Sequence, residues 1–155
     1  MMGTLLRGTV AGAAGTTVLN AVTYGDMAVR GRPTSSAPEG TVEALADLTG
    51  VTVGGTGETR GNRLTGLGAL SGIVTGVGVG TAVAVLRKAG VRLPLWMGGV
   101  LTGALAMAVT DLSMAELDVS DPRTWSGTDW LSDAIPHLIY GLVTYGIMTA
   151  GEQRT

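Results

Sequence analysis

Four glycines at four-residue spacing lie inside a stretch of the chain that carries no charged residue. The stretch covers residues 64–86, and as a helix it would reach about 34 Å at ~1.5 Å per residue. That length slightly exceeds the ~30 Å hydrocarbon thickness of a bilayer. In lipid the backbone keeps its helical hydrogen bonds, and small residues let a second helix come close, so we predict a membrane span with a glycine contact face. The glycines are Gly68, Gly72, Gly76 and Gly80.

The composition of the chain favours the same class of protein. Hydrophobic residues make up 45% of the sequence and charged residues 14%. With 26 glycines and no phenylalanine, a water-soluble fold would bury too little large apolar surface to offset the chain entropy. A net charge of −2 without a run of lysine or arginine argues against a nucleic-acid partner. The absence of cysteine excludes disulfides and thiolate metal sites.

Three further apolar segments are bordered by charged residues and have aromatic side chains near their ends, as membrane spans do. We therefore predict an all-α integral membrane protein, a four-helix transmembrane bundle that forms a single domain over residues 1–155. Arg7 before the first segment also fits a signal peptide, although Leu19 and Ala21 make a poor cleavage site. The predicted spans cover about residues 8–28, 64–86, 93–115 and 133–151.

The first loop, residues 30–63, is long enough to hold structure of its own. Ser36 followed by Glu39 fits a capping box, and Gly50 follows a run of apolar residues at helical spacing. We predict a short amphipathic helix here, lying on the membrane surface or across the mouth of the bundle. The apolar residues of this helix are Val42, Leu45 and Leu48.

Small residues at four-residue spacing also occur in the first and third spans. Gly8 and Gly12 form one such pair, and Gly99 and Gly103 form another. Each set makes a ridge of small side chains on its helix, which predicts closely packed helices. An alternative is that the glycines line a pore or let helices slide during gating.

The loops differ in charge, and this difference predicts the orientation in the membrane. The short loop after the second span carries Arg87, Lys88 and Arg92, whereas the loop after the third span is acidic. Cations in short loops favour the cytoplasmic side, so we place this loop and both termini in the cytoplasm of a bacterium with the chain in the inner membrane. The first loop also carries arginines and would lie outside, so the cation counts on the two sides are nearly even.

Antiparallel threading places six charged or titratable side chains on one side of the membrane: Asp26, Arg63, Asp111, Glu116, Asp133 and His137. Four of them, Asp26, Asp111, Glu116 and His137, make up the candidate site. A buried carboxylate beside a histidine can exchange protons, so we predict a candidate proton or cation site that opens to the outer face. The alternative is that these are border residues that are paired or solvated. Because proline fits the first turn of a helix, Pro136 predicts that His137 lies close to the membrane interface.

The chain shows no pattern that predicts a catalytic or metal site. One histidine is too few for the ligand sets that zinc prefers. Neither a nucleophile elbow nor an H-E-x-x-H pattern occurs. We therefore predict that the protein is not an enzyme and that it needs no cofactor and no metal.

Parts of the third and fourth spans resemble the YagU-type family of small bacterial inner-membrane proteins. The similar segments are LWMGGVLTGALA at residues 95–106, PHLIYG at 136–141 and, more loosely, RPTSSAPE at 32–39. The resemblance implies a bacterial plasma-membrane protein with a link to acid tolerance, and it brings no catalytic residues. The glycine-dense second span departs from the family.

Two functional hypotheses follow from the sequence. In the first, the chain is a small multi-span membrane protein that responds to protons or cations and acts in acid or stress tolerance. In the second, it is a structural or accessory subunit that uses its glycine ridges to bind a partner or to self-associate. The predicted partners are the lipid bilayer and either a second copy of the chain or another membrane protein.

Overall fold

The computed structural model describes residues 1–150, and all the regular secondary structure in that range is helical. This confirms the predicted all-α class. Each predicted span falls on one long helix, although residues 93 and 94 of the third span precede the start of α4, and the short helix expected in the first loop is present as α2. Gly151, the last residue of the fourth predicted span, lies outside the described residues. The elements are α1 (Met2–Arg30), α2 (Ala37–Thr49), α3 (Gly57–Lys88), α4 (Leu95–Glu116), the 3-10 helix η1 (Pro122–Thr124) and α5 (Gly127–Ala150).

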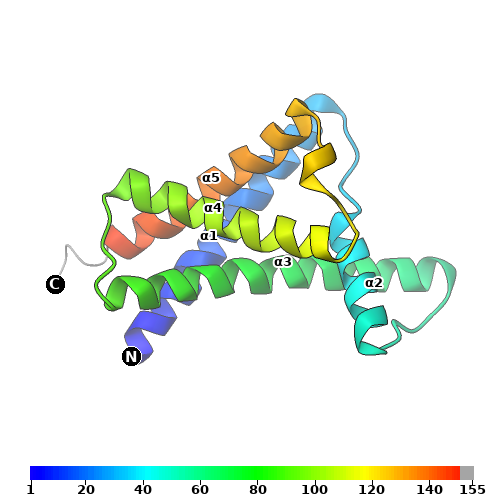
Figure 1. Cartoon of the computed structure of the whole chain (residues 1–155), viewed down its shortest axis with the longest axis horizontal. Helices are drawn as coiled ribbons and strands as arrows, with labels where there is room; N and C mark the ends of the chain where they lie inside the picture. The colour runs from blue at the N-terminus through cyan, green and yellow to red at the C-terminus, as the bar shows by residue number, and fades with distance from the viewer. Residues whose placement is uncertain (151–155) are drawn as a thin grey trace.

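The long helices pack as two crossing pairs (Figure 1). α1 packs along both α3 and α5, α4 packs mainly on α5, and α3 and α4 touch each other much less. α1 and α5 run obliquely across α3 and α4, so the start of α1, the end of α5 and the α3–α4 loop lie at one end of the molecule. The other end holds α2 and the loop between α4 and α5.

α2 rests on the first half of α3 and ends where the sequence predicts. Gly50 closes it in the left-handed conformation at φ 69°, which glycine adopts without strain. The capping box predicted from Ser36 and Glu39 is wrong, because the Ser36 side chain makes no capping bond. Ser36 has ψ near 1° rather than the extended backbone of a capping residue, and the Ala37 N–H bonds to the Ser35 hydroxyl at 3.1 Å instead.

α5 starts earlier than predicted, and this moves Pro136 into the helix interior. A capping box formed by Ser126 and Asp129 begins the helix. The Asp129 N–H donates to the Ser126 hydroxyl at 3.2 Å, and the Ser126 N–H donates to the Asp129 carboxylate at 3.0 Å. The bonds from Ser126 lower the pKa of the Asp129 carboxyl. The prediction that Pro136 occupies the first helical turn is therefore wrong, since this cap supplies two helical turns before it.

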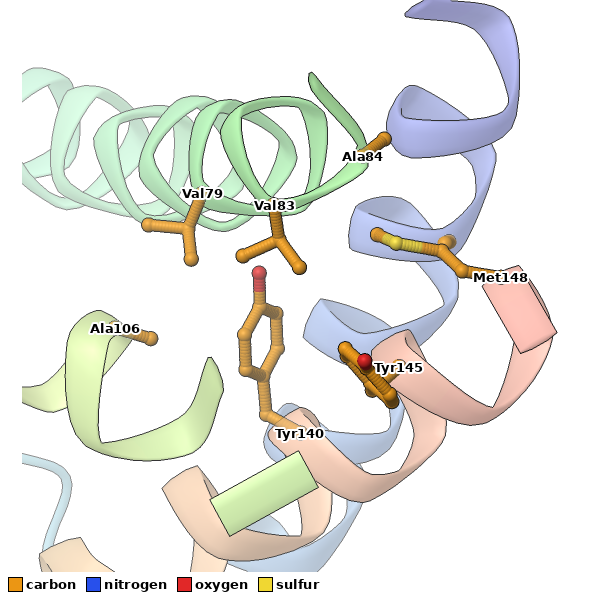
Figure 2. Close-up of a cluster of buried hydrophobic side chains, with 8 residues drawn as sticks. Val79, Val83, Ala84, Ala106, Tyr140, Tyr145 and Met148 are labelled. Atoms are coloured by element: carbon orange, nitrogen blue, oxygen red, sulfur yellow. The ribbon is translucent and has the colours of Figure 1, made fainter. Parts of the chain in front are cut away.

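The buried core is small and is built around one tyrosine. Tyr140 of α5 is 1% exposed, and its ring points toward Val79 and Val83 of α3 (Figure 2). Its hydroxyl donates a 2.6 Å hydrogen bond to the backbone oxygen of Gly76. Tyr145 and Met148 of α5 are also buried, at 2% and 1% exposure. Most of the remaining interior consists of glycine, alanine and threonine, so the helices approach closely.

Large apolar side chains lie mainly on the outside of the molecule. Val74 on α3 is 70% exposed, and Trp96 and Leu112 on α4 are 67% and 64% exposed. Among residues 1–150, α3 and α4 are the two helices that are long and apolar enough to cross a membrane. By this criterion two of the four predicted spans are supported. α1 and α5 do not meet it, since α1 is rich in glycine and threonine and α5 begins with polar residues.

Candidate functional site

Two carboxylates and the histidine lie together where α4 meets α5. Asp111 of α4 is 6% exposed, and the Thr110 hydroxyl lies 3.4 Å from its Oδ1 atom. Asp133 and His137, both on α5, are close enough to Asp111 to interact with its charge. Helix α4 thus supplies one buried acid and helix α5 supplies an acid and an imidazole one turn apart.

His137 and Asp133 are directly linked. The His137 Nδ1 atom lies 2.9 Å from the Asp133 backbone oxygen and 3.3 Å from the Asp133 Oδ1 atom. The second carboxylate oxygen of Asp133, Oδ2, is buried without a hydrogen-bond partner in the described part of the chain. A buried oxygen without a donor is costly, and a bound proton or cation would remove that cost. We call Asp111, Asp133 and His137 the acid–imidazole cluster.

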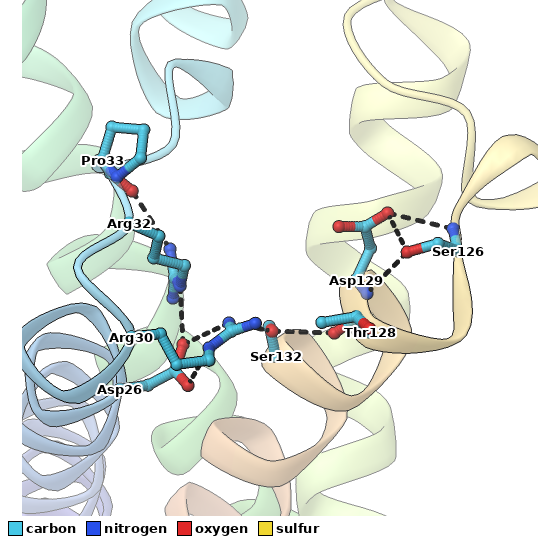
Figure 3. A network of polar contacts seen from close by, with 8 residues as sticks. All are labelled: Asp26, Arg30, Arg32, Pro33, Ser126, Thr128, Asp129 and Ser132. Carbon is cyan, nitrogen blue, oxygen red and sulfur yellow. Dashed lines mark hydrogen bonds and ion pairs between the residues drawn. The ribbon is translucent and has the colours of Figure 1, made fainter.

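Asp26 belongs to a different network (Figure 3). Its carboxylate accepts two hydrogen bonds from Arg30 and one from Arg32, each at 2.6 Å. Arg30 also donates to the Ser132 hydroxyl at 2.6 Å, which ties the end of α1 to the start of α5. The negative charge of Asp26 is therefore balanced by two guanidinium groups. Glu116, at the end of α4, is exposed and has no hydrogen bond or ion pair within residues 1–150.

The structure thus brings together two of the four predicted site residues, Asp111 and His137, and adds Asp133. The sequence places Asp133 on the same side of the membrane but does not assign it to the site. The four-residue interval between Asp133 and His137 is the signal that could have identified it, since residues i and i+4 share one face of a helix. No group of three or more His, Cys, Asp or Glu side chains among residues 1–150 has an arrangement that could hold a metal ion.

The glycines of α1 and α3 meet at a direct backbone crossing. A Cβ atom added to Gly80 would lie 2.6 Å from the Cα atom of Gly12, and one added to Gly12 would lie 2.6 Å from the oxygen of Gly76. A Cβ atom on Gly8 would lie 2.7 Å from the Cα atom of Thr81. Since real Cβ atoms do not approach backbone this closely, only glycine permits this crossing.

A second glycine crossing joins α4 to α5 and lies beside the acid–imidazole cluster. A Cβ atom on Gly103 would lie 2.5 Å from the His137 backbone oxygen, and one on Gly99 would lie 3.0 Å from the Cα atom of Leu142. A Cβ atom on Gly141 would overlap the backbone of both Gly99 and Gly103. This close approach lets side chains of α4 and α5 share one cluster.

The remaining ridge glycines of α3 face elsewhere. A Cβ atom on Gly68 would lie 3.0 Å from the Pro38 Cβ atom of α2, and one on Gly72 would meet nothing within 4 Å. Each four-residue step turns ~400°, so the ridge winds around the helix and cannot face one neighbour along its whole length. Gly141, in contrast, has no four-residue glycine series around it, so the ridge pattern did not identify it.

Comparison of the chain with protein-family models, curated proteins and solved structures gives no match. Function is therefore inferred from the arrangement of the chain's own side chains. Three features are available for that inference. They are the acid–imidazole cluster, the two glycine crossings and the apolar outer surface.

Proposed function

We propose that the chain is a bacterial inner-membrane protein whose α1, α3, α4 and α5 cross the bilayer, and that its acid–imidazole cluster binds and releases a proton. We further propose that the protein acts in acid or stress tolerance, which is the role that the resemblance of the C-terminal half to the YagU-type family implies. The proposal has two parts, the membrane location and the titrating site. Each part rests on its own observations.

The distribution of large and small side chains supports the membrane location. In water, exposed apolar surface as extensive as that of α3 and α4 is rare on a monomer, because it promotes association. In a bilayer the same side chains would contact lipid, and the small residues inside would provide the close packing that holds membrane helices together. Trp96 near the start of α4 would lie at headgroup depth, where tryptophan is enriched.

The charges at the two ends of the bundle support one orientation. The α3–α4 loop carries Arg92 and follows Arg87 and Lys88, and it lies at the same end as the start of α1 and the end of α5 (Figure 1). We place this end in the cytoplasm. The acid–imidazole cluster, near the opposite end of α4, would then open toward the outer face.

One observation carries the proposed activity: the Asp133 Oδ2 atom is buried without a partner, beside a histidine and a second buried acid. Imidazole exchanges protons near neutral pH, and a nearby carboxylate interacts more strongly with its charged form than with its neutral form. A proton arriving from the outer side could therefore be shared within the cluster. Its binding would change the attraction between α4 and α5 at the crossing beside it.

The accessory-subunit hypothesis receives less support from the contacts of the glycines. Gly8, Gly12, Gly76 and Gly80 are used within the chain at the α1–α3 crossing, so they do not offer a free face for a partner. Gly72 is the ridge glycine that faces outward from α3. A partner docked there would leave the acid–imidazole cluster unaffected.

The proposal predicts the pH response of the protein in proteoliposomes. We expect the wild-type protein to show pH-dependent tryptophan fluorescence and acid-driven proton uptake into vesicles containing a pH-sensitive dye. Asp111→Asn and His137→Ala should each reduce proton uptake about tenfold or more, because a loss of ~1.4 kcal/mol in proton binding corresponds to tenfold. Glu116→Gln is the matched control, since it removes an exposed carboxylate from the same helix.

An unchanged pH response in both cluster variants would contradict the proposed activity. Equal losses in the Glu116→Gln control would also contradict it, because the response would then depend on acidic charge in general. Gel filtration in mild detergent verifies that the variants keep the fold of the wild-type protein. Asp111→Asn nearly conserves the volume of the side chain and His137→Ala reduces it, so we expect both variants to fold.

A further inference from the structure

A second polar feature lies at the opposite end of the bundle from the acid–imidazole cluster. A pocket of about 410 Å³ opens between the first turns of α1, the end of α3, the α3–α4 loop and the end of α5. Four cationic side chains line it: Arg7 from α1, Arg87 and Lys88 from α3, and Arg92 from the loop. We call this the basic pocket. Met148 of α5 forms part of its apolar floor.

Three of the four cations of the basic pocket are not paired with a carboxylate in the part of the chain that the structure describes. No ion pair within residues 1–150 involves Arg7, Lys88 or Arg92. The Lys88 ammonium lies 3.7 Å from the Met1 sulfur, a weak acceptor. Arg87 is 5% exposed, and its guanidinium lies 4.4 Å from the centre of the Tyr145 ring, which holds it at the inner wall. Like charges gathered in this way repel each other, and an anion bound among them would relieve that repulsion.

Exposed apolar side chains neighbour the residues of the basic pocket along the chain. Leu6 precedes Arg7 and is 64% exposed, Leu86 precedes Arg87 and is 49% exposed, and Trp96 follows the loop. An anion that carries hydrocarbon chains fits this arrangement better than a free ion does. Its headgroup would contact the cations while its chains lie along the apolar side chains of α1, α3 and α4.

We propose that the basic pocket binds the phosphate headgroup of an anionic phospholipid from the cytoplasmic leaflet. The inference rests on the proposed membrane location, because only an inserted protein would present the basic pocket at headgroup depth. Basic pockets between membrane helices on the cytoplasmic side are suited to phosphate headgroups, since arginine and phosphate form charge-assisted hydrogen bonds. The bound lipid would fasten the α3–α4 loop to the first turn of α1.

The test measures lipid binding to the full chain purified in a neutral detergent. Phosphatidylglycerol is added and compared with phosphatidylcholine of the same acyl chains, with bound lipid counted by native mass spectrometry and the melting temperature recorded. We expect phosphatidylglycerol to bind and to raise the melting temperature, and phosphatidylcholine to do neither. The double variant Arg7→Gln/Arg92→Gln should bind phosphatidylglycerol about thirtyfold more weakly, from roughly fivefold for each cation removed near the surface.

Arg60→Gln is the matched control, because Arg60 pairs with Glu43 at 2.6 Å at the other end of α3. It should bind phosphatidylglycerol like the wild type. Equal binding of the two lipids, or equal weakening by Arg60→Gln, would overturn the proposed site. Glycerol phosphate or inorganic phosphate that displaces the lipid at equal concentration would also overturn it, since the site would then be one for free anions. If the protein needs detergent but shows no lipid preference, the lipid site is contradicted while the membrane location stands. If the protein folds in plain buffer, both the lipid site and the membrane location are contradicted.

Discussion

Replacing Gly80 by isoleucine is expected to destabilise the protein severely. A side chain at this position would meet the Cα atom of Gly12 at 2.6 Å and the oxygen of Gly8 at 2.8 Å. Both contacts are backbone, which cannot rotate away as a flexible side chain can. We expect a loss on the order of 3 kcal/mol, the upper part of the usual range for overpacking, or complete separation of α1 from α3. Thermal unfolding in mild detergent, followed by near-ultraviolet circular dichroism, measures the effect.

Gly72→Ile is the matched control for this experiment. Gly72 lies on the same helix and in the same charge-free stretch, but a Cβ atom there meets nothing within 4 Å. We expect this variant to melt within a few degrees of the wild type, because the new side chain points outward. Similar melting temperatures for the two variants would show that the α1–α3 crossing does not exist in the folded protein.

Replacing Tyr140 by alanine should have the second large effect. Tyr140 is 1% exposed and is the largest fully buried side chain of the described chain. Its removal leaves a cavity between α3 and α5 that glycine and threonine neighbours cannot fill. We expect a loss of about 3–5 kcal/mol, as for other large aromatic side chains removed from a packed interior. Unfolding in mixed micelles of increasing denaturing detergent measures this loss.

Tyr140→Phe separates the hydrogen bond from the packing of the ring. The variant keeps the ring but loses the 2.6 Å bond to the Gly76 oxygen. We expect it to cost only about 1 kcal/mol, because the Gly76 oxygen is an acceptor within a helix and a typical net hydrogen bond contributes that much. A Tyr140→Phe variant as unstable as Tyr140→Ala would contradict the view that packing dominates at this position.

The long helices were predictable because their signals are local. An uncharged stretch bordered by arginines defines most of α3, and a glycine after helically spaced apolar residues ends α2 at Gly50. Helix starts were less predictable. α5 extends upstream of Pro136 because Ser126 and Asp129 cap it, and a proline inside a helix is tolerated when the surrounding contacts compensate for the missing N–H.

The candidate site was only partly predictable, because it depends on contacts between helices. Antiparallel threading puts Asp111 and His137 in one leaflet, and the structure places them in one cluster. Threading alone does not show which acids are paired with neighbouring cations. Asp26 is bound by Arg30, four residues later on the same face of α1, and by Arg32, which lies beyond the end of that helix. The four-residue interval is a signal for the first pairing, whereas no helical spacing encodes the second.

The glycine pattern shows the same division between local and tertiary information. Four-residue spacing predicts a surface of small residues on α3, yet only helix rotation and crossing angle decide which glycines are covered. Gly76 and Gly80 meet α1 whereas Gly72 faces outward. Gly141 is essential to the α4–α5 crossing although it belongs to no series.

The most direct measurement of the membrane location is cysteine labelling, since the natural chain contains no cysteine. Single variants Val74→Cys, Val51→Cys and Val91→Cys replace exposed residues of the middle of α3 and of the two loops that flank it. A charged maleimide is applied to membranes opened on both sides. In hydrocarbon a thiol neither ionises nor meets the charged reagent, whereas in water it reacts. We predict that the loop cysteines are labelled and that Val74→Cys is not; labelling of Val74→Cys as fast as Val51→Cys would contradict a bilayer around this helix.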